Sequence, residues 1–289
     1  MGAQHQALSS ASLARLGELL GVRGEELRVE SLSGGVSNRS FRVAAGGQSW
    51  VARFSWDLPA HHRIDAAAER EVLECVAAAG LTPRVIASDP DEGILVTRYL
   101  NGAQAWSAES AREPRNIRRA AARLRALHAL DCQAEPFLPT AVAAGYLEGC
   151  GGRVALREEE VAWADELERL ARAFGSRFAA TALCHNDLIA PNILDDGELW
   201  FVDFEYAARS HPVVDLASLA GMNCYGAPAQ ALLVEAYYGE RPVPFSQAQF
   251  GDAVRMLQSL SYFWAKSRLR VRDTDVLASF ADRMAAVLR

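Results

Sequence analysis

The sequence predicts an α+β fold of two lobes, a small β-rich N-terminal lobe and a larger helical C-terminal lobe. Short apolar segments rich in β-branched and aromatic residues, separated by turn residues, dominate the first third of the chain. Long segments with apolar residues at helical spacing dominate the rest. The chain has 289 residues, and 50% of them are hydrophobic, which is enough for one large domain or two lobes.

The predicted N-terminal lobe covers residues 1–96. Leucines repeat at helical spacing over residues 8–20, and strand-like segments follow: "LRVESL", "RSFRVAA" and "SWVARFS". Gly46-Gly47 joins the last two segments as a hairpin. After a helix over residues 65–79, "RVIASDPDEGILVTRYL" gives two more strands around a turn. We therefore expect five strands with one inserted helix.

The predicted C-terminal lobe covers residues 103–289, and the segment "TRYLNG" at 97–102 is expected to form the hinge between the lobes. Apolar periodicity predicts its long helices. These helices are expected at 115–130, 157–174, 228–238, 246–267 and 273–288.

Charge and hydropathy narrow the classes of partner. A net charge of −6 disfavours nucleic-acid binding, which normally requires a basic face. No apolar run approaches the ~18 residues of a membrane span, and the N-terminus lacks the basic and apolar regions of a signal peptide. We expect a cytoplasmic protein with neither nucleic-acid nor membrane partners.

The five cysteines are odd in number and far apart in the sequence, and no CxxC occurs. This pattern is typical of reduced, mostly buried cysteines in a cytoplasmic protein.

Acidic and amide residues gather in "LCHNDLIAPNILDDGELWFVDFEY", residues 183–206. Asp187 and Asn192 are five residues apart, so one tight loop can present both, and the "DDG" turn brings Asp203 back beside Asn192. Phosphoryl transfer from ATP requires one carboxylate that orients the attacking hydroxyl and accepts its proton. It also requires a carboxylate and an amide oxygen that bind Mg²⁺. These three residues fit those roles.

"HNDLIAPN" followed by "VDFEY" resembles the catalytic loop and metal-binding segment of the aminoglycoside phosphotransferase and choline kinase superfamily. These are small-molecule kinases with a protein-kinase-like fold, and the resemblance covers about residues 30–265. It implies ATP and Mg²⁺ as cofactors, Asp187 as the catalytic residue, and Asn192 and Asp203 as metal ligands. It also implies that His185 braces the loop and that Asp215, in "HPVVDLAS", is a structural aspartate that steadies it.

The stretch "LSGGVSNRSFRV" resembles the hairpin that covers the phosphates in choline and thiamine kinases. Glycines let backbone N–H groups approach phosphate. Gly34, Gly35, Ser37 and Asn38 are therefore predicted to bind the nucleotide.

The resemblance also requires a cation on the following strand that contacts the α- and β-phosphates. The only lysine of the chain, Lys266, lies far downstream, whereas Arg53 in "WVARFS" stands at the expected place. A carboxylate from the 65–79 helix should pair with Arg53. Glu69 lies three, four and seven residues before the apolar residues of that helix, on its buried face, so we predict Glu69 as the partner, with Glu71 as the alternative.

The resemblance to choline kinases implies an acceptor pocket between the catalytic loop and the late helices, lined by aromatic and acidic residues, and aromatic faces attract cations. Candidates are Glu205, Tyr206, and two residues of "SYFWAKSR", Tyr262 and Trp264. Adjacent aromatic residues on one helix cannot all face one direction. Glu205 has two possible roles, beside the metal or facing a cationic substrate.

We expect a small-molecule alcohol as the acceptor, with choline or ethanolamine ahead of thiamine. An aminoglycoside or amino sugar fits less well, because the late helices are not unusually acidic.

Two other classes compete with a small-molecule kinase. A non-catalytic nucleotide-binding module would have no need for the complete set of Asp187, Asn192 and Asp203, and all three are present. A protein kinase would carry Gly rather than Glu205 after Asp203-Phe204, and an Ala-Pro-Glu segment, which this sequence lacks.

Overall fold

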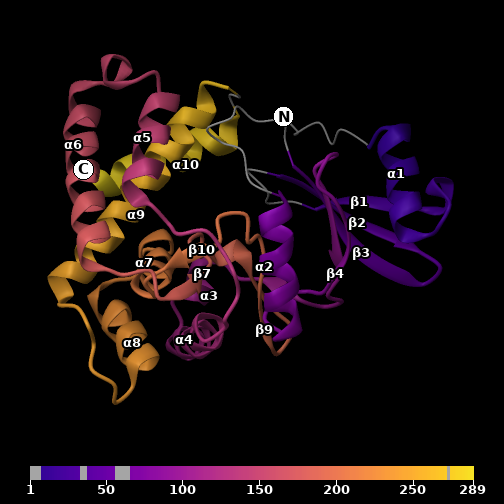
Figure 1. Ribbon diagram of the computed structural model, residues 1–289, viewed down its shortest axis with the longest axis horizontal. Helices are drawn as coiled ribbons and strands as arrows, with labels where there is room; N and C mark the ends of the chain where they lie inside the picture. The colour runs from indigo at the N-terminus through magenta and orange to yellow at the C-terminus, as the bar shows by residue number, and fades with distance from the viewer. Residues whose placement is uncertain (1–7, 33–37, 56–65, 272–273) are drawn as a thin grey trace.

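The computed structural model describes residues 8–32, 38–55, 66–271 and 274–289. A β-sheet lobe and a helical lobe lie side by side, with helix α2 between them (Figure 1). The α+β two-lobe prediction is confirmed. The predicted nucleotide-binding residues Gly34, Gly35 and Ser37 lie outside the described residues.

The N-terminal lobe is an antiparallel five-stranded sheet of order β1-β2-β3-β5-β4. Gly46 and Gly47 have φ of 56° and 79°, the left-handed conformation that a two-residue hairpin turn requires and that glycine adopts without strain. Leu16 of α1 shares a buried cluster with Phe41 and Trp50 of the sheet. The elements are α1 Ser10–Leu20, η1 Gly24–Glu26, β1 Arg28–Leu32, β2 Asn38–Ala45, β3 Gln48–Ser55, β4 Val85–Asp89 and β5 Ile94–Arg98.

Helix α2, Ala66–Ala78, follows β3 but packs on the helical lobe. Its apolar residues Val72, Leu73 and Val76 are buried in the core of that lobe and not in the core of the sheet lobe. Its end is fixed there too, because the Arg123 guanidinium donates to the Gly80 carbonyl at 2.6 Å. The position of α2 therefore depends on the lobe that carries the acidic cluster.

The C-terminal lobe contains helices and two small sheets, of strand orders β6-β8-β9 and β10-β7. The helices are α3 Ala108–Ala111, α4 Pro114–His128, α5 Pro139–Gly149, η3 Arg153–Ala155, α6 Glu158–Arg177, η4 Ala190–Asn192, α7 Val213–Met222, α8 Ala227–Tyr238, α9 Gln247–Leu269 and α10 Asp275–Leu288. The strands are β6 Gln104–Ala105, β7 Ala182–Cys184, β8 Ile193–Asp195, β9 Leu199–Phe201 and β10 Ala208–Ser210.

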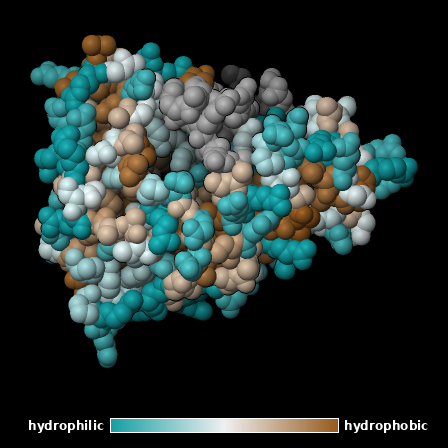
Figure 2. All heavy atoms as spheres, in the orientation of Figure 1, coloured by the Kyte–Doolittle hydropathy of each residue, from teal (hydrophilic) through white to brown (hydrophobic). Residues whose placement is uncertain are grey.

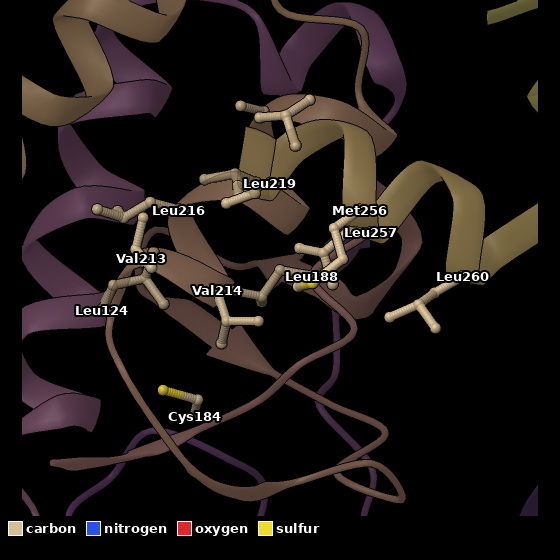
Figure 3. Close-up of a cluster of buried hydrophobic side chains, with 14 of the residues drawn as sticks. Leu124, Cys184, Leu188, Val213, Val214, Leu216, Leu219, Met256, Leu257 and Leu260 are labelled. Carbon is tan, nitrogen blue, oxygen red and sulfur yellow. The ribbon is translucent and has the colours of Figure 1, made fainter. Parts of the chain in front are cut away.

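All five helices predicted in this lobe are present, but α5 and α7 were not predicted. Helix α7 is buried on all sides, so it has no polar face and no helical periodicity in its sequence. Figure 3 shows Val213, Val214, Leu216 and Leu219 of α7 among side chains of neighbouring elements. Those neighbours include Leu124 of α4, Leu188 of the acidic segment, and Met256 and Leu257 of α9. This packing fixes the polar side chains of α7 in place.

On the face shown in Figure 2, hydrophilic and hydrophobic residues are interspersed over both lobes. Across the described ranges, every helix falls short of the length and apolarity that a bilayer crossing needs.

The expectation that all cysteines are reduced is wrong for one pair. Cys75 of α2 and Cys132, which follows α4, form a disulfide with a Cα–Cα distance of 6.0 Å. The two residues meet because α2 packs against the helical lobe, a long-range contact that cysteine spacing does not indicate. Cys150, Cys184 and Cys224 are free.

We predict that this disulfide stabilises the fold by restricting the unfolded chain. Its cysteines are separated by 57 residues, and closing a loop of that length contributes about 4 kcal/mol. Cys132→Ser should lower the free energy of unfolding in urea by roughly that amount. Dithiothreitol should have the same effect on the wild type and none on the variant.

The matched control is Cys224→Ser, which removes an exposed free thiol. It should leave stability and its response to dithiothreitol as in the wild type. Five reactive thiols in the unreduced, denatured protein would contradict the pairing.

Candidate active site

The acidic segment is held in shape by one buried carboxylate. Asp215, in the first turn of α7, is fully buried and accepts hydrogen bonds from the backbone N–H groups of His185 at 2.8 Å and Asn186 at 2.7 Å. His128 Nε2, from α4, lies 3.0 Å from the same carboxylate. Asn186 has φ of 64°, a conformation that costs energy for a non-glycine residue and that these bonds hold.

Two more side chains at α7 continue this support along the loop. Leu188 N–H donates to Ser218 Oγ at 3.0 Å, and Ala190 N–H donates to Asn223 Oδ1 at 2.9 Å. Three side chains in and just after one helix therefore bind the N–H groups of residues 185, 186, 188 and 190 of the loop. Asp215 matches its expected place. Sequence reasoning missed Ser218, Asn223 and His128, because nothing in the sequence shows that this helix faces the loop.

His185 joins the loop to the strand that precedes Asp203. Its Nε2 lies 2.9 Å from the Val202 carbonyl, and its Nδ1 accepts from Asp187 N–H at 3.3 Å. A carbonyl can only accept, so the proton is on Nε2. Burial lowers the pKa of His185, so the ring is neutral and has the bracing geometry that the sequence predicted.

Asp187 and Asn192 face each other across the loop. Asn192 Nδ2 donates to the Asp187 carbonyl at 2.9 Å and to Asp187 Oδ2 at 3.2 Å. Burial raises the pKa of Asp187 to about 7, and the negative charge of Asp203 is the second cause of this rise. Near neutral pH this carboxyl group can both hold and release a proton, as a general base must.

Arg53 connects the sheet lobe, α2 and the acidic segment. Its Nη2 forms an ion pair with Glu69, and its Nη1 donates to Asp203 Oδ1 at 2.7 Å. Glu69 is 6% exposed whereas Glu71 is exposed, so Glu69 is confirmed as the partner of Arg53. Burial opposes the charge on Arg53, but Glu69 and Asp203 outweigh it and raise its pKa.

The donors at this site fit a magnesium ion. Among the described residues, the Asn192 amide oxygen and Asp203 Oδ2 accept no hydrogen bond, so both are available as ligands. Both are the hard oxygen donors that Mg²⁺ prefers. Asp203 has φ of 68°, a strained conformation often found at functional positions. Arg53 Nε and Glu69 Oε1 are buried and have no hydrogen-bond partner among the described residues, so both can bind a further group at this site.

Asn38 and Glu205 add a further polar pair. Asn38 Nδ2 donates to Glu205 Oε2 at 2.6 Å and lies 3.5 Å from Asp203 Oδ1. Burial, followed by the charge of Asp203, raises the pKa of Glu205. The structure thus places Asn38 against the two acids, and Asn38 is the one described residue of the four that were predicted to bind nucleotide in the phosphate-covering hairpin.

Aromatic side chains lie next to these acids. Trp264 Nε1 donates to the Tyr206 hydroxyl at 2.9 Å, and Asn186 Nδ2 donates to the Tyr206 carbonyl at 2.9 Å. The structure thus brings together two of the predicted pocket residues. Arg268, which sequence reasoning missed, stacks on the Trp264 ring with its guanidinium carbon 5.4 Å from the ring centroid.

The prediction that Tyr262 belongs to this aromatic group is wrong. Its hydroxyl donates to Glu160 of α6 at 2.5 Å. Its ring packs edge-on against Trp163 of α6, with the two ring centroids 5.1 Å apart. Residues two apart on a helix point in roughly opposite directions, so Tyr262 and Trp264 diverge. Tyr262 instead lines a separate cavity of about 240 Å³, together with Glu160 and Lys266.

Comparisons with known proteins agree with this geometry. A family profile described as the phosphotransferase enzyme family matches residues 28–243. No curated protein matches the sequence.

Solved structures also resemble the fold. A choline/ethanolamine kinase family protein from Mesorhizobium loti has a TM-score of 0.80 at 27% identity, over 96% of this chain and 92% of that one. The choline kinase LicA from Streptococcus pneumoniae has a TM-score of 0.80 at 20% identity, and the match covers 96% of this chain and 97% of LicA. A thermostable mutant of an aminoglycoside phosphotransferase, in complex with ADP and hygromycin B, has a TM-score of 0.67 at 16% identity. The match covers 97% of this chain and 98% of that protein.

The fold and the site together define a kinase-like phosphotransferase. The chain belongs to the phosphotransferase enzyme family, as its profile match over residues 28–243 shows.

We predict that Asp215 is required for the stability of the loop. Asp215→Asn keeps the size of the side chain but leaves one oxygen for three donors and turns an NH₂ group toward them. The free energy of unfolding in urea should fall by about 3 kcal/mol. The exposed residue Asp252 gives the control, because Asp252→Asn should change the free energy of unfolding by less than about 0.5 kcal/mol. Equal stability of the two variants would contradict this role.

We also predict a pH-dependent contribution from Glu160. Burial opposes its charge, but hydrogen bonds from Lys266, Tyr262 and Arg157 lower its pKa to about 2. A carboxyl group whose pKa is lowered on folding stabilises the protein above its ordinary pKa, and this stabilisation disappears as the pH falls to the folded value. Glu160→Gln should therefore cost about 2 kcal/mol at pH 7 and progressively less from pH 5 toward pH 2.

Urea unfolding of both proteins across that range measures the difference. Glu158→Gln, at an exposed position on the same helix, is the matched control and should show no such trend. A cost for Glu160→Gln that stays constant with pH would contradict the prediction.

Proposed function

We propose that the protein is an ATP-dependent kinase that transfers the γ-phosphate of ATP to the hydroxyl of a small alcohol bearing an amine, such as ethanolamine or choline. The observation that carries this proposal is the convergence of Asp187, Asn192 and Asp203, with the Arg53–Glu69 pair on Asp203. Phosphoryl transfer is achieved mainly by positioning and charge stabilisation, and this set supplies both.

Asp187 is assigned to orient the acceptor hydroxyl and take its proton. The bond from the acceptor oxygen to the γ-phosphorus forms as the bond from that phosphorus to the bridging oxygen breaks, and ADP leaves. Burial raises the pKa of Asp187, which favours uptake of the hydroxyl proton by its carboxylate. The bond from Asn192 Nδ2 to Asp187 Oδ2 fixes the direction of the carboxylate.

Asn192 and Asp203 are assigned to hold Mg²⁺. When bound, this ion neutralises the charge that develops on the phosphate oxygens. Arg53 is assigned to the α- and β-phosphates, because a guanidinium binds phosphate oxygens in pairs. Glu69 orients Arg53 from α2, and the buried Nε of Arg53 has no acceptor in the ranges that the structure describes.

An amine on the acceptor is supported by the charges beside Asp187. Glu205 carries a carboxylate, and Tyr206 and Trp264 offer aromatic surface close to it. The similarity to a choline/ethanolamine kinase family protein points to the same class. The alternative acceptors are thiamine, aminoglycosides and amino sugars.

Replacing Asp187 by Asn tests the assignment. Mg²⁺-dependent ADP release should fall by about 10³-fold with any acceptor that the wild type uses, because the general base is lost. Affinity for ATP should change little, since Asp187 is not assigned to the nucleotide. The acceptor panel is ethanolamine, choline, thiamine, an aminoglycoside and glucosamine.

Calorimetric titration with ATP and the unfolding midpoint serve as controls for binding and folding. Near-normal turnover by Asp187→Asn would show that Asp187 is not the base. Failure of the whole panel, with ATP binding intact, would exclude these five acceptors.

A further inference from the structure

Arg268 is a buried arginine beside the candidate active site, and the described residues give it no anionic partner. It lies on α9, one turn after Trp264, and is 6% exposed. Its Nη2 is 3.5 Å from the Tyr206 hydroxyl, a distance at which a hydrogen bond is weak, and its Nε is buried without any hydrogen bond. Among the described residues, no carboxylate lies within ion-pair distance of its guanidinium.

A buried charge without a partner is expensive, which makes this arrangement informative. The other arginine buried near the site, Arg53, shows how this fold compensates such a charge, because it contacts two carboxylates, Glu69 and Asp203. Within the described part of the chain, the Arg268 guanidinium contacts the Trp264 ring and the neutral Tyr206 hydroxyl. An anionic ligand would supply the missing partner.

Arg268 lies in the same electrostatic environment as the proposed base. The pKa of Tyr206 is raised first by burial and then by the charge of Glu205, while Arg268 lowers it and Asp187 raises it. Tyr146 of α5 responds to the same three charged residues. Contacts at Tyr206 connect Arg268 with the loop that carries Asp187. The Tyr206 hydroxyl lies 3.5 Å from Arg268 Nη2, and the Tyr206 carbonyl accepts a hydrogen bond at 2.9 Å from Asn186 Nδ2, on the residue before Asp187.

The position of Arg268 also argues against an acceptor that is only a cation. Proteins that recognise a quaternary ammonium group bind it against the face of an aromatic ring. Here the Arg268 guanidinium already stacks on Trp264, and it repels a second positive charge at that ring. Glu205 still offers a place for an amine on the Asn38 side of the site.

We propose that the acceptor alcohol carries a carboxylate that binds Arg268, in addition to its amine, so that the substrate class is hydroxy amino acids and their relatives. This inference rests on the proposed kinase function, keeps the amine of its acceptor, and replaces ethanolamine and choline by alcohols that carry a carboxylate as well. Arg268 is then the specificity residue, because the molecule that satisfies its charge is bound in preference to the matched alcohol that lacks the carboxylate.

Matched pairs of acceptors that differ by one carboxylate test the proposal. The pairs are ethanolamine with L-serine, and 3-aminopropan-1-ol with L-homoserine. For the wild type, kcat/KM should be higher for the carboxylate-bearing member of at least one pair, by about tenfold or more. Arg268→Gln should lower that value by about 100-fold, because a buried charge pair is lost, and should change the value for the amine by less than about threefold. Arg268→Lys should retain part of the preference.

Arg283→Gln is the matched control, because Arg283 also stacks on a ring, 5.5 Å from the Phe280 centroid, but is exposed on α10. It should leave all values unchanged. The unfolding midpoint of each variant shows that its fold is intact. Equal or better use of the amine-only members by the wild type would overturn the proposal and leave the kinase function standing.

Calorimetric binding of both members of each pair, in the presence of Mg²⁺ and ADP, separates the two claims. Binding of the carboxylate member that Arg268→Gln abolishes, without transfer that depends on Asp187, would support the inference and overturn the proposed function. Binding and transfer that are the same with and without Arg268 would overturn the inference alone. Absence of binding by both carboxylate members would also overturn it.

Discussion

The carboxylate of Asp215 is the contact on which the geometry of the site depends. It takes hydrogen bonds from two successive N–H groups of the acidic segment and lies against His128 of α4, so three parts of the chain meet at one buried group. Ser218 and Asn223 extend the same support. Because α7 is packed on all sides, these side chains cannot move independently of the core. The loop therefore holds a strained residue, Asn186, immediately before Asp187.

A second constraint is electrostatic. Asp187, Asp203 and Glu205 lie close enough that the charge of Asp203 raises the pKa of both other acids, and burial adds to the effect. Arg53 offsets part of this repulsion and, with Glu69, connects β3 and α2 to Asp203. Helix α2 belongs to the core of the helical lobe, and the disulfide fixes it there. Glu69 and Asp203, the two carboxylates that bind Arg53, are therefore both anchored in that lobe. A site with this surplus of negative charge is suited to a divalent cation and its phosphate ligands.

Local patterns in the sequence predicted the parts of the site that depend on local structure. The spacing of Asp187 and Asn192, the turn before Asp203, and the buried face that carries Glu69 are all set within a few residues, so they could be read directly. Residues whose roles arise from packing between distant segments could not. The support from Ser218 and Asn223, the disulfide of Cys75 with Cys132, and the unpaired charge of Arg268 depend on which helix faces which. Tyr262 was misplaced for the same reason, because the sequence does not show which side of α9 faces the acids.

The central claim is that this site moves a phosphoryl group from ATP to a carbon-bound hydroxyl. The most direct test is ³¹P NMR of the protein with ATP, Mg²⁺ and the amine-bearing alcohols, with and without a carboxylate. Phosphate bound to carbon through oxygen gives a resonance that is split by the adjacent carbon-bound protons, whereas inorganic phosphate gives a single line. The account predicts the split resonance, growing as ATP is consumed. Unchanged ATP, or ADP and inorganic phosphate as the only new products with every acceptor, would contradict it.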